Sequence, residues 1–270
     1  MESELISRSH HFLNFLPLVG NMLATKHETE YLQIKEKALY DLVTEADLAA
    51  EKMVLDEIQK YFPNDGFLSE EFGEKIGESG FRWVIDPLDG TTNYAQGLPL
   101  YGVSVAVEHE ETKQPVVGMV FFPELKTFYH AIKGKGAYRD KTLIHVSKKN
   151  QLKDSLFVTG FPYDRNKSID TLMTYYKSIL QKSRGIRRTG AATLDLCWLA
   201  DGKFDGYYEI GLKPWDMAAA GLIAQEAGGK LTTMDGNDFD LYIPSLLATN
   251  GILHDLLLNV FEGHIIREVY

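Results

Sequence analysis

The acidic residues of this sequence concentrate in a few short segments. Asp86 and Asp89 stand three residues apart in VIDPLDGTTNY, residues 84–94. Other acids that follow or precede apolar segments are Glu70, Glu71, Asp216, Asp41 and Asp47. A carboxylate beside a buried strand is tolerable when a metal, a base or a proton neutralises it. Oxygen ligands suit Mg²⁺, Mn²⁺ or Ca²⁺ better than Zn²⁺, so these segments predict a site for a hard divalent cation.

The residues around Asp86 suit a phosphate site. Pro87 stiffens the segment, and Leu88 can offer its backbone carbonyl as a further oxygen ligand. Gly90 lets the backbone approach a ligand closely. Thr91 and Thr92 can start a helix whose free N–H groups face an anion. Cations on one side and a helix N-terminus on the other would together bind a phosphate group.

Each acid also has a structural explanation when it is taken alone. Asp47 lies three residues after Thr44, which is the spacing of a capping box. Asp216 stands in the first turn of an expected helix, where it complements the helix dipole. Glu70 and Glu71 could be a solvated strand end. Several such acids beside apolar strands, taken together, favour the metal site.

The elements that must position these acids follow from the hydrophobic periodicity. Helices are expected at 2 to about 27, 44 to about 61 (Leu48, Val54 and Ile58 inward), 169–180, 192–200, 214 to a stop at Gly228-Gly229, and from about 252. Strands are expected at 66–70, 81–86, 102–110, 115–122, 126–133, 155–160, 204–210, 230–234 and 245–250. GKGAYRD, residues 134–140, fails the dinucleotide-loop pattern and predicts a hairpin turn. The pattern predicts one domain over 1–270, with an α+β half to about 150 and an α/β half from about 151.

Composition limits the class of partner. The chain has 270 residues, a net charge of −10 and a pI near 5.3, which disfavours nucleic acid and anionic membranes as partners. No secretory signal or apolar run of about 18 residues is present, so we expect a cytoplasmic protein. The single cysteine, Cys197, reads as a buried apolar residue. The basic cluster SRGIRRTG, residues 183–190, is interpreted as a solvated face, an anion site or a subunit contact.

Three segments in a fixed order resemble the inositol monophosphatase family. They are GFLSEEFG, WVIDPLDGTTNY and PWDMAAAGLIAQEAGG, and DLVTEAD and RRTGAATLDLCWLA also match the family pattern. The family belongs to the lithium-sensitive, magnesium-dependent phosphatases, and the resemblance runs from about the first helix to the last. It implies a layered α-β-α-β-α sandwich in one domain, and a homodimer.

The resemblance also implies roles for individual residues. The implied metal ligands are Glu70, Asp86, the carbonyl of Leu88, Asp89 and Asp216. The implied catalytic residues are Asp47, Thr91 and Glu70, with Thr91 and Asp47 orienting and deprotonating the attacking water. The implied substrate contacts are Asp89, Gly90, Thr91, Ala192, Glu209 and Asp216. Glu71 would support the ligands, and Asp41 would be structural.

The implied reaction is hydrolysis of a phosphomonoester by in-line attack of water. Four ionised ligands and a nearly dianionic phosphate call for roughly two to three Mg²⁺. Mn²⁺ would be a possible substitute, and Li⁺ and Ca²⁺ would be inhibitors. The expected partner is a small phosphorylated substrate.

The alcohol part of the substrate stays open. Glu209 fits recognition of inositol hydroxyls, which ranks inositol 1-phosphate first. Lys213, before Trp215, could bind a second phosphate or be a surface lysine, so the alternatives are the 2′-phosphate of NADP(H), fructose 1,6-bisphosphate and 3′-phosphoadenosine phosphate. A metal-dependent phosphate-binding or regulatory protein is a non-catalytic alternative, which the presence of Asp47 and Thr91 disfavours.

Overall fold

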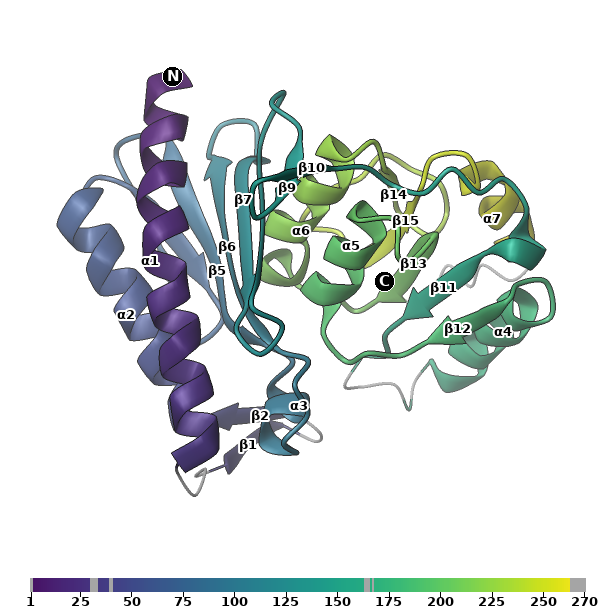
Figure 1. The fold of residues 1–270 in the computed structure, drawn as a ribbon, viewed down its shortest axis with the longest axis horizontal. Helices are drawn as coiled ribbons and strands as arrows, with labels where there is room; N and C mark the ends of the chain where they lie inside the picture. The colour runs from purple at the N-terminus through teal and green to yellow at the C-terminus, as the bar shows by residue number, and fades with distance from the viewer. Residues whose placement is uncertain (1, 30–33, 39–40, 163–165, 167, 263–270) are drawn as a thin grey trace.

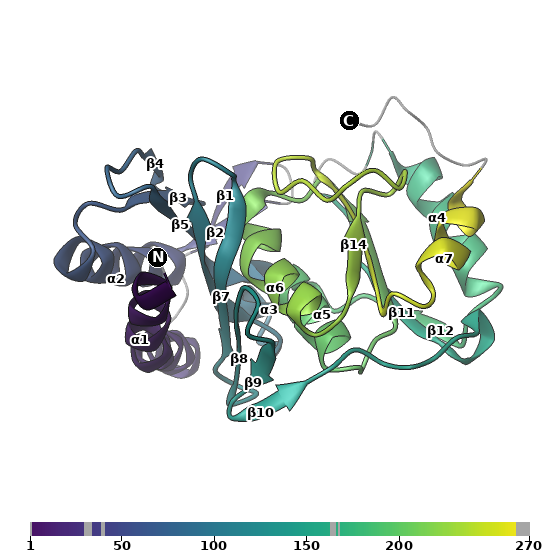
Figure 2. The same ribbon diagram turned by 90° about the horizontal axis from the view of Figure 1, so that it is seen from above.

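The structure is a computed structural model that describes residues 2–29, 34–38, 41–162, 166 and 168–262. Helices and sheets alternate in five layers across the molecule (Figure 1). The two outer helical layers enclose two sheets, and a central pair of helices separates those sheets, as the view from above also shows (Figure 2). The predicted α-β-α-β-α sandwich is therefore confirmed.

The first sheet has eight strands in the order β10-β9-β8-β7-β6-β5-β3-β4. Its bounds are β3 (Gly66–Ser69), β4 (Gly73–Lys75), β5 (Phe81–Asp89), β6 (Gly102–His109), β7 (Gln114–Phe122), β8 (Thr127–Ile132), β9 (Ala137–Arg139) and β10 (Thr142–Ile144). Strands β5 to β10 form the expected antiparallel meander, and β3 joins β5 in parallel. Two helices cover one face, α1 (Glu2–Thr29) and α2 (Glu45–Tyr61).

The second sheet has five strands in the order β12-β11-β13-β15-β14 and mixes parallel with antiparallel pairs. Its bounds are β11 (Leu156–Thr159), β12 (Gly185–Arg187), β13 (Gly206–Ile210), β14 (Lys230–Thr232) and β15 (Ser245–Thr249). Its outer face packs against α4 (Ile169–Leu180) and α7 (His254–Phe261), and its inner face against α5 (Ala192–Ala200) and α6 (Pro214–Glu226).

Several short elements escaped the sequence analysis. They are the hairpin β1 (Ile34–Ala38) with β2 (Asp41–Thr44), strands β4, β9, β10 and β12, helix α3 (Thr91–Ala95) in its final extent and the 3₁₀ turn η1 (Leu152–Asp154). All of them are three to five residues long, which is too short for a periodic pattern to identify. The hairpin turn predicted at 134–140 does connect β8 to β9.

Helix α2 corrects one prediction about its buried face. Leu48 was expected to point inward, but its side chain is 42% exposed. The buried stripe instead runs through Asp47, Glu51, Val54 and Ile58, at helical spacing. Two acids therefore occupy core-facing positions that a hydrophobic pattern reserves for apolar residues, and both lie next to the candidate site.

Strand β5 runs three residues further than predicted. Asp86 pairs with Ser104 and Asp89 pairs with Gly102, so three steps on β5 match two steps on β6. This extra residue is a β-bulge, and Pro87, which has no N–H to donate, lies within it. The bulge changes the direction in which the two carboxylates project from the end of the strand.

The central helix α6 packs very closely against the first sheet. A Cβ added to Gly118 of β7 would lie 2.4 Å from the backbone oxygen of Ala219. The segment from Met217 to Ala224 is buried on all sides and contains mostly small residues. Small side chains on helix and strand thus allow the sheet and the helix backbone to meet.

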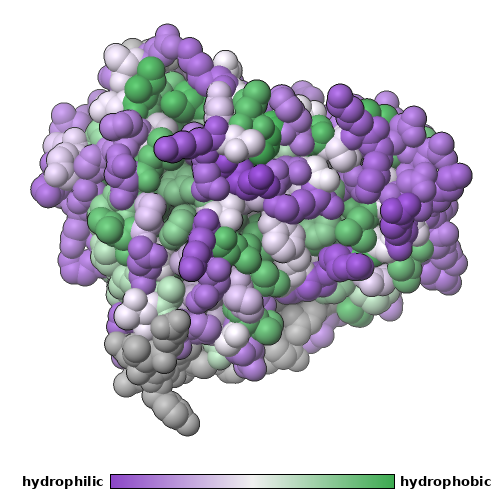
Figure 3. Space-filling view, in the orientation of Figure 1, coloured by the Kyte–Doolittle hydropathy of each residue, from purple (hydrophilic) through white to green (hydrophobic). Residues whose placement is uncertain are grey.

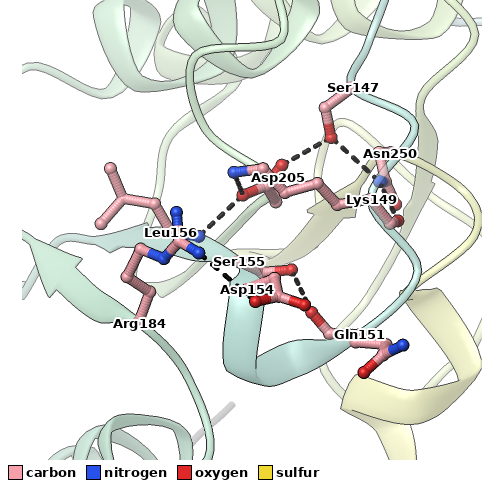
Figure 4. A network of polar contacts seen from close by, with 9 residues as sticks. All are labelled: Ser147, Lys149, Gln151, Asp154, Ser155, Leu156, Arg184, Asp205 and Asn250. Carbon is pink, nitrogen blue, oxygen red and sulfur yellow. Dashed lines mark hydrogen bonds and ion pairs between the residues drawn. The ribbon is translucent and has the colours of Figure 1, made fainter.

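A polar network holds the crossover between the two sheets (Figure 4). The buried carboxylate of Asp205 accepts hydrogen bonds from the Ser147 hydroxyl (2.5 Å), Lys149 Nζ (2.9 Å) and the N–H of Leu156 (2.7 Å). The Asn250 side chain donates to the backbone oxygen of Lys149 at 2.8 Å. These contacts fix where the chain leaves the first sheet and enters the second.

Hydrophilic side chains dominate the face seen in Figure 3, with single hydrophobic groups between them, and they are densest at the right, over the second half of the chain. None of the described helices combines the length and the hydropathy needed to span a lipid bilayer.

Candidate active site

Asp86 lies at the bulge of β5 and is 2% exposed. One of its carboxylate oxygens accepts the N–H of Leu88 at 3.0 Å. Burial raises the pKa of Asp86 well above its ordinary value, and the negative charges of Glu70, Asp89 and Asp216 raise it further. The structure therefore brings the four predicted acidic ligands close enough for mutual electrostatic repulsion.

Asp89 connects the first sheet to the second half of the chain. Its carboxylate accepts the N–H groups of Ala192 (3.1 Å) and Thr193 (2.8 Å), and a short hydrogen bond from the Thr193 hydroxyl. These donors form the first turn of α5, where a negative charge is stabilised by free N–H groups. Burial raises the pKa of Asp89, and the hydrogen bonds from Thr193 and Ala192 oppose that shift.

Asp47 and Thr91, the predicted catalytic pair, lie in contact with each other. One oxygen of Asp47 accepts the N–H (2.8 Å) and the hydroxyl (2.6 Å) of Thr44, and so completes the capping box of α2. The other oxygen lies 3.2 Å from the Thr91 hydroxyl, which also lies 3.0 Å from the backbone oxygen of Leu88. Asp47 is 1% exposed, and burial raises its pKa. The capping role and the predicted contact with Thr91 are thus both present.

Gly90 lies between Asp89 and α3 and has a left-handed backbone, with φ of 87°. A Cβ at this position would lie 2.8 Å from the backbone oxygen of Leu100. Both the dihedral angle and the lack of space favour glycine. Gly90 therefore allows the chain to turn from β5 into α3 against the backbone of Leu100.

The loop that carries Glu70 is held by Glu51, which the sequence analysis missed. The carboxylate of Glu51 accepts the N–H groups of Glu71 (3.0 Å) and Phe72 (2.7 Å). Glu51 is fully buried, and burial raises its pKa. Glu51 lies four residues after Asp47 on the same face of α2, and this spacing of two acids could have identified it.

Asp216 and Glu209 come from the second half of the chain. The Asp216 carboxylate accepts the N–H of Lys213 at 2.7 Å, and burial, followed by that carboxylate's acidic neighbours, raises its pKa well above the ordinary value. Burial raises the pKa of Glu209 to about 7, and a 2.5 Å hydrogen bond from the Tyr207 hydroxyl opposes the shift. The Lys213 side chain is exposed, and the hydrogen bond to Asp216 comes from the Lys213 backbone.

The donor set of this site fits a hard divalent cation. Within the described ranges, Asp86, Asp89 and Asp216 form no ion pair with lysine or arginine. Three buried or half-buried carboxylates that raise one another's pKa need a neutralising partner to be ionised together. The part of the chain that the structure describes contains no preassembled group of three carboxylate, histidine or cysteine side chains in metal-binding geometry. The acids are neighbours rather than a finished coordination shell.

Most of the predicted site residues therefore lie around one region. The charges of Glu70 and Asp216 act on Asp86, and the charge of Glu71 acts on Asp47. Ala192 takes part through its N–H, which Asp89 accepts. Asp41 begins β2, but its side chain lies outside the described part of the chain. Thr193 was missed, since only the folded chain brings its hydroxyl to Asp89.

Comparisons with known proteins agree with this arrangement. The chain is 44% identical over 232 residues to "Phosphatase IMPL1, chloroplastic" of Arabidopsis thaliana, a match of 83% of this chain that spans only 62% of that relative. It is 38% identical to "Putative Nus factor SuhB" of Neisseria meningitidis, over 91% of each chain. It is 41% identical to "Inositol-1-monophosphatase" of Synechocystis, over 83% of this chain and 78% of the relative.

Solved structures have the same fold. The extragenic suppressor protein suhB from Bartonella henselae superposes with a TM-score of 0.90 at 33% identity, over 94% of this chain and 98% of that one. The sequence profile of the "Inositol monophosphatase family" matches residues 17–265. The match covers the two sheets and every acid discussed above, and the chain therefore belongs to the inositol monophosphatase family, a family of phosphoric monoester hydrolases.

Proposed function

We propose that this chain hydrolyses a small phosphomonoester in a magnesium-dependent reaction, with inositol 1-phosphate as its first substrate. The observation that carries the proposal is the Thr91 hydroxyl, 3.2 Å from Asp47 and 3.0 Å from the Leu88 carbonyl. A threonine hydroxyl has one proton and two lone pairs, so it can donate to only one of these oxygens at a time.

Thr91 can act as a proton relay. When its hydroxyl donates to Asp47, a lone pair is free to accept a proton from a water molecule beside it. Burial raises the pKa of Asp47, which makes this carboxylate a stronger base than an exposed aspartate. The two hydrogen bonds from Thr44 hold the other carboxylate oxygen, so the oxygen that faces Thr91 keeps its orientation.

The residues that would hold Mg²⁺ are Glu70, Asp86, the carbonyl of Leu88, Asp89 and Asp216. When bound, the metal supplies charge neutralisation and a more acidic water. The N–H groups of Gly90 and Thr91 would receive the phosphate oxygens. Mn²⁺ is proposed as a substitute, and Li⁺ and Ca²⁺ as inhibitors.

Inositol 1-phosphate is ranked first on two grounds. Glu209 presents a half-buried carboxylate beside Tyr207, and such a group can accept hydrogen bonds from vicinal hydroxyls. The Synechocystis relative is named an inositol-1-monophosphatase. The alternatives NADP(H), fructose 1,6-bisphosphate and 3′-phosphoadenosine phosphate stay on the test panel. The non-catalytic alternative, a metal-dependent phosphate-binding or regulatory protein, is disfavoured by the presence of Asp47 and Thr91. It stays in the test, because the Neisseria relative is named a Nus factor.

The test is phosphate release from the purified chain on this substrate panel, with and without Mg²⁺ and with a lithium arm. A preference for inositol 1-phosphate that disappears without Mg²⁺ supports both class and substrate. Faster release from NADP or a bisphosphate would keep the metal-dependent chemistry and replace the substrate. No release from any substrate, while calorimetry still detects Mg²⁺ binding, would contradict the proposal.

Three further points of the proposal concern the oligomeric state, nucleic-acid binding and cellular location. We propose that the chain folds as a single domain and that two copies form a homodimer, which light scattering would test. The net charge of −10 supports a chain that acts without nucleic acid, although the Neisseria relative is named a Nus factor, so a binding assay with RNA is the relevant check. A cytoplasmic location stays a prediction, and the Arabidopsis relative is named chloroplastic.

A further inference from the structure

Strand β13 carries two consecutive tyrosines that face opposite sides of the second sheet. Tyr207 is buried between the two sheets together with residues of α5 and α6. Tyr208 packs on the outer face, where its ring centroid lies 5.4 Å from that of Phe261. Successive side chains of a strand alternate between faces, so Glu209 follows Tyr207 on the inner face. The Tyr207 hydroxyl donates a hydrogen bond of 2.5 Å to Glu209 Oε2 on that side.

A second contact holds Glu209 from the neighbouring strand. Strand β11 pairs with β13 in parallel (Figure 1), and Thr159 stands opposite Tyr208, so Gly160 comes next to Glu209. A Cβ added to Gly160 would lie 1.9 Å from Glu209 Oε2 and 2.2 Å from Glu209 Oε1. The carboxylate of Glu209 thus occupies the space that any side chain at position 160 would need.

The two contacts together restrict the position of Glu209. Tyr207 holds one carboxylate oxygen, and the backbone of Gly160 borders both oxygens. A glutamate side chain has three rotatable bonds, and ordering them before a substrate binds lowers the entropic cost of binding. A carboxylate has about four acceptor sites, so the hydrogen bond from Tyr207 leaves acceptor capacity for hydroxyl groups of a substrate.

The hydroxyl of Tyr207 also stabilises the ionised form of Glu209. Burial is the largest influence and brings the pKa of Glu209 to about 7, and the charge of Asp89 acts in the same direction. The hydrogen bond from Tyr207 and the charge of Arg188 lower this pKa. Burial raises the pKa of Tyr207 itself well above its ordinary value, so its hydroxyl stays protonated and donates. Tyr207 therefore keeps more of the Glu209 carboxylate in its accepting form.

From these contacts we infer that Tyr207 and Gly160 are positioning residues, which determine specificity for the alcohol part of the substrate by fixing Glu209. The inference rests on the proposed function, in which Glu209 accepts hydroxyl groups of the alcohol, and it extends that role to the two residues that hold the carboxylate. The chain should therefore select phosphomonoesters whose alcohol part carries free hydroxyl groups over those whose alcohol part carries none.

The test compares inositol 1-phosphate with p-nitrophenyl phosphate, whose alcohol part has no further hydroxyl, in the Mg²⁺-loaded full chain. The readout is the ratio of kcat/KM for inositol 1-phosphate to kcat/KM for p-nitrophenyl phosphate. Tyr207→Phe should lower this ratio about tenfold, mainly through KM for the inositol ester, because a hydrogen bond to a charged group is lost. The matched control is Tyr208→Phe, which removes the neighbouring hydroxyl from the outer face and should leave the ratio unchanged.

Gly160→Ala disturbs the same carboxylate from the other side. The backbone of Gly160 lies outside the left-handed region and accepts alanine, while the new Cβ displaces the flexible end of Glu209. This variant should lower the ratio as Tyr207→Phe does, with a melting temperature close to that of the wild type. In a Glu209→Ala background neither substitution should change the ratio further, because each acts through Glu209.

Three results would overturn the inference. They are an unchanged ratio in Tyr207→Phe or Gly160→Ala, an equal change in Tyr208→Phe, and an effect of Tyr207→Phe that persists in the Glu209→Ala background. If Tyr207→Phe does not fold, Gly160→Ala decides.

The behaviour of the wild type separates this inference from the proposed function. Phosphate release from inositol 1-phosphate by the wild type, combined with any of those three results, leaves the proposed function in place while the role of Tyr207 and Gly160 fails. If the wild type hydrolyses neither ester, the proposed function fails. Calorimetric binding of inositol 1-phosphate in Mg²⁺ then decides, and equal affinity in wild type and Tyr207→Phe, or no binding by either, overturns the inference.

Discussion

The substitution Thr91→Val separates proton transfer from metal binding. Valine keeps the branched shape of a side chain that is 8% exposed, and it replaces the hydroxyl with a methyl group. Asp47 loses one hydrogen bond and keeps the two from Thr44, so the loss of folding stability should be about 1 kcal/mol. The Leu88 carbonyl loses a hydrogen-bond donor and stays available as the proposed metal ligand.

The expected effect on the reaction is much larger. A general acid–base group contributes roughly 10² to 10⁴ in rate, so kcat should fall by about that factor. The Mg²⁺ concentration for half-maximal activity should change little, because the Thr91 hydroxyl is not one of the proposed metal ligands. We expect less than about a threefold change, which corresponds to ~0.6 kcal/mol. The assay is phosphate release from inositol 1-phosphate across a Mg²⁺ titration, with thermal unfolding as the stability measurement.

Thr92→Val is the matched control, because Thr92 is the next residue of α3 and its side chain is exposed. It should retain wild-type kcat. The relay is refuted if Thr91→Val and Thr92→Val have similar kcat values. It is also refuted if the Mg²⁺ requirement of Thr91→Val rises as steeply as kcat falls, since the hydroxyl would then serve the metal site.

Three further perturbations have defined outcomes. Asp89→Asn should raise the Mg²⁺ requirement and nearly abolish turnover; unchanged turnover at ordinary Mg²⁺ would remove Asp89 from the ligands. Gly90→Ala should lower the free energy of unfolding by about 1–2 kcal/mol, because φ is 87° and the new Cβ meets the Leu100 oxygen at 2.8 Å, and an unchanged melting temperature would contradict this. Burial lowers the pKa of His254 to about 4, so the unfolded chain binds an extra proton between about pH 6.5 and 4. The contribution of His254 to stability should therefore fall as pH drops through that window, by up to about 3 kcal/mol, and urea titrations should show the wild type losing about that much stability relative to His254→Gln.

The long helices and the pair of aspartates on β5 could be located from the sequence, because each signal lies within one segment. The binding of a metal by these aspartates stays a prediction. Phe12, Leu16, Val19 and Leu23 all belong to the buried face of α1, as their spacing indicates. The two aspartates of β5 stand out in the chain for the same local reason. A match to a known family pattern extended this local information to the whole fold.

The residues that were missed depend on contacts between distant segments. Thr193 donates to Asp89 across 104 positions of sequence, and Glu51 holds a loop 20 residues away. Leu48 was placed inward because an apolar residue in a helix normally is, whereas Asp47 and Glu51 take that face here. The bulge at Pro87 depends on pairing with β6 and is likewise invisible in a single strand.

The contact between Gly118 and Ala219 has a consequence for how relatives of this chain can diverge. A methyl group on Gly118 would lie only 2.4 Å from a backbone oxygen, so this interior contact tolerates almost no change in side-chain volume. Arg188 and Lys213 lie at exposed positions, where many residue types fit. Substitutions at the two outer positions should therefore be tolerated more readily than any increase in side-chain volume at this interior contact.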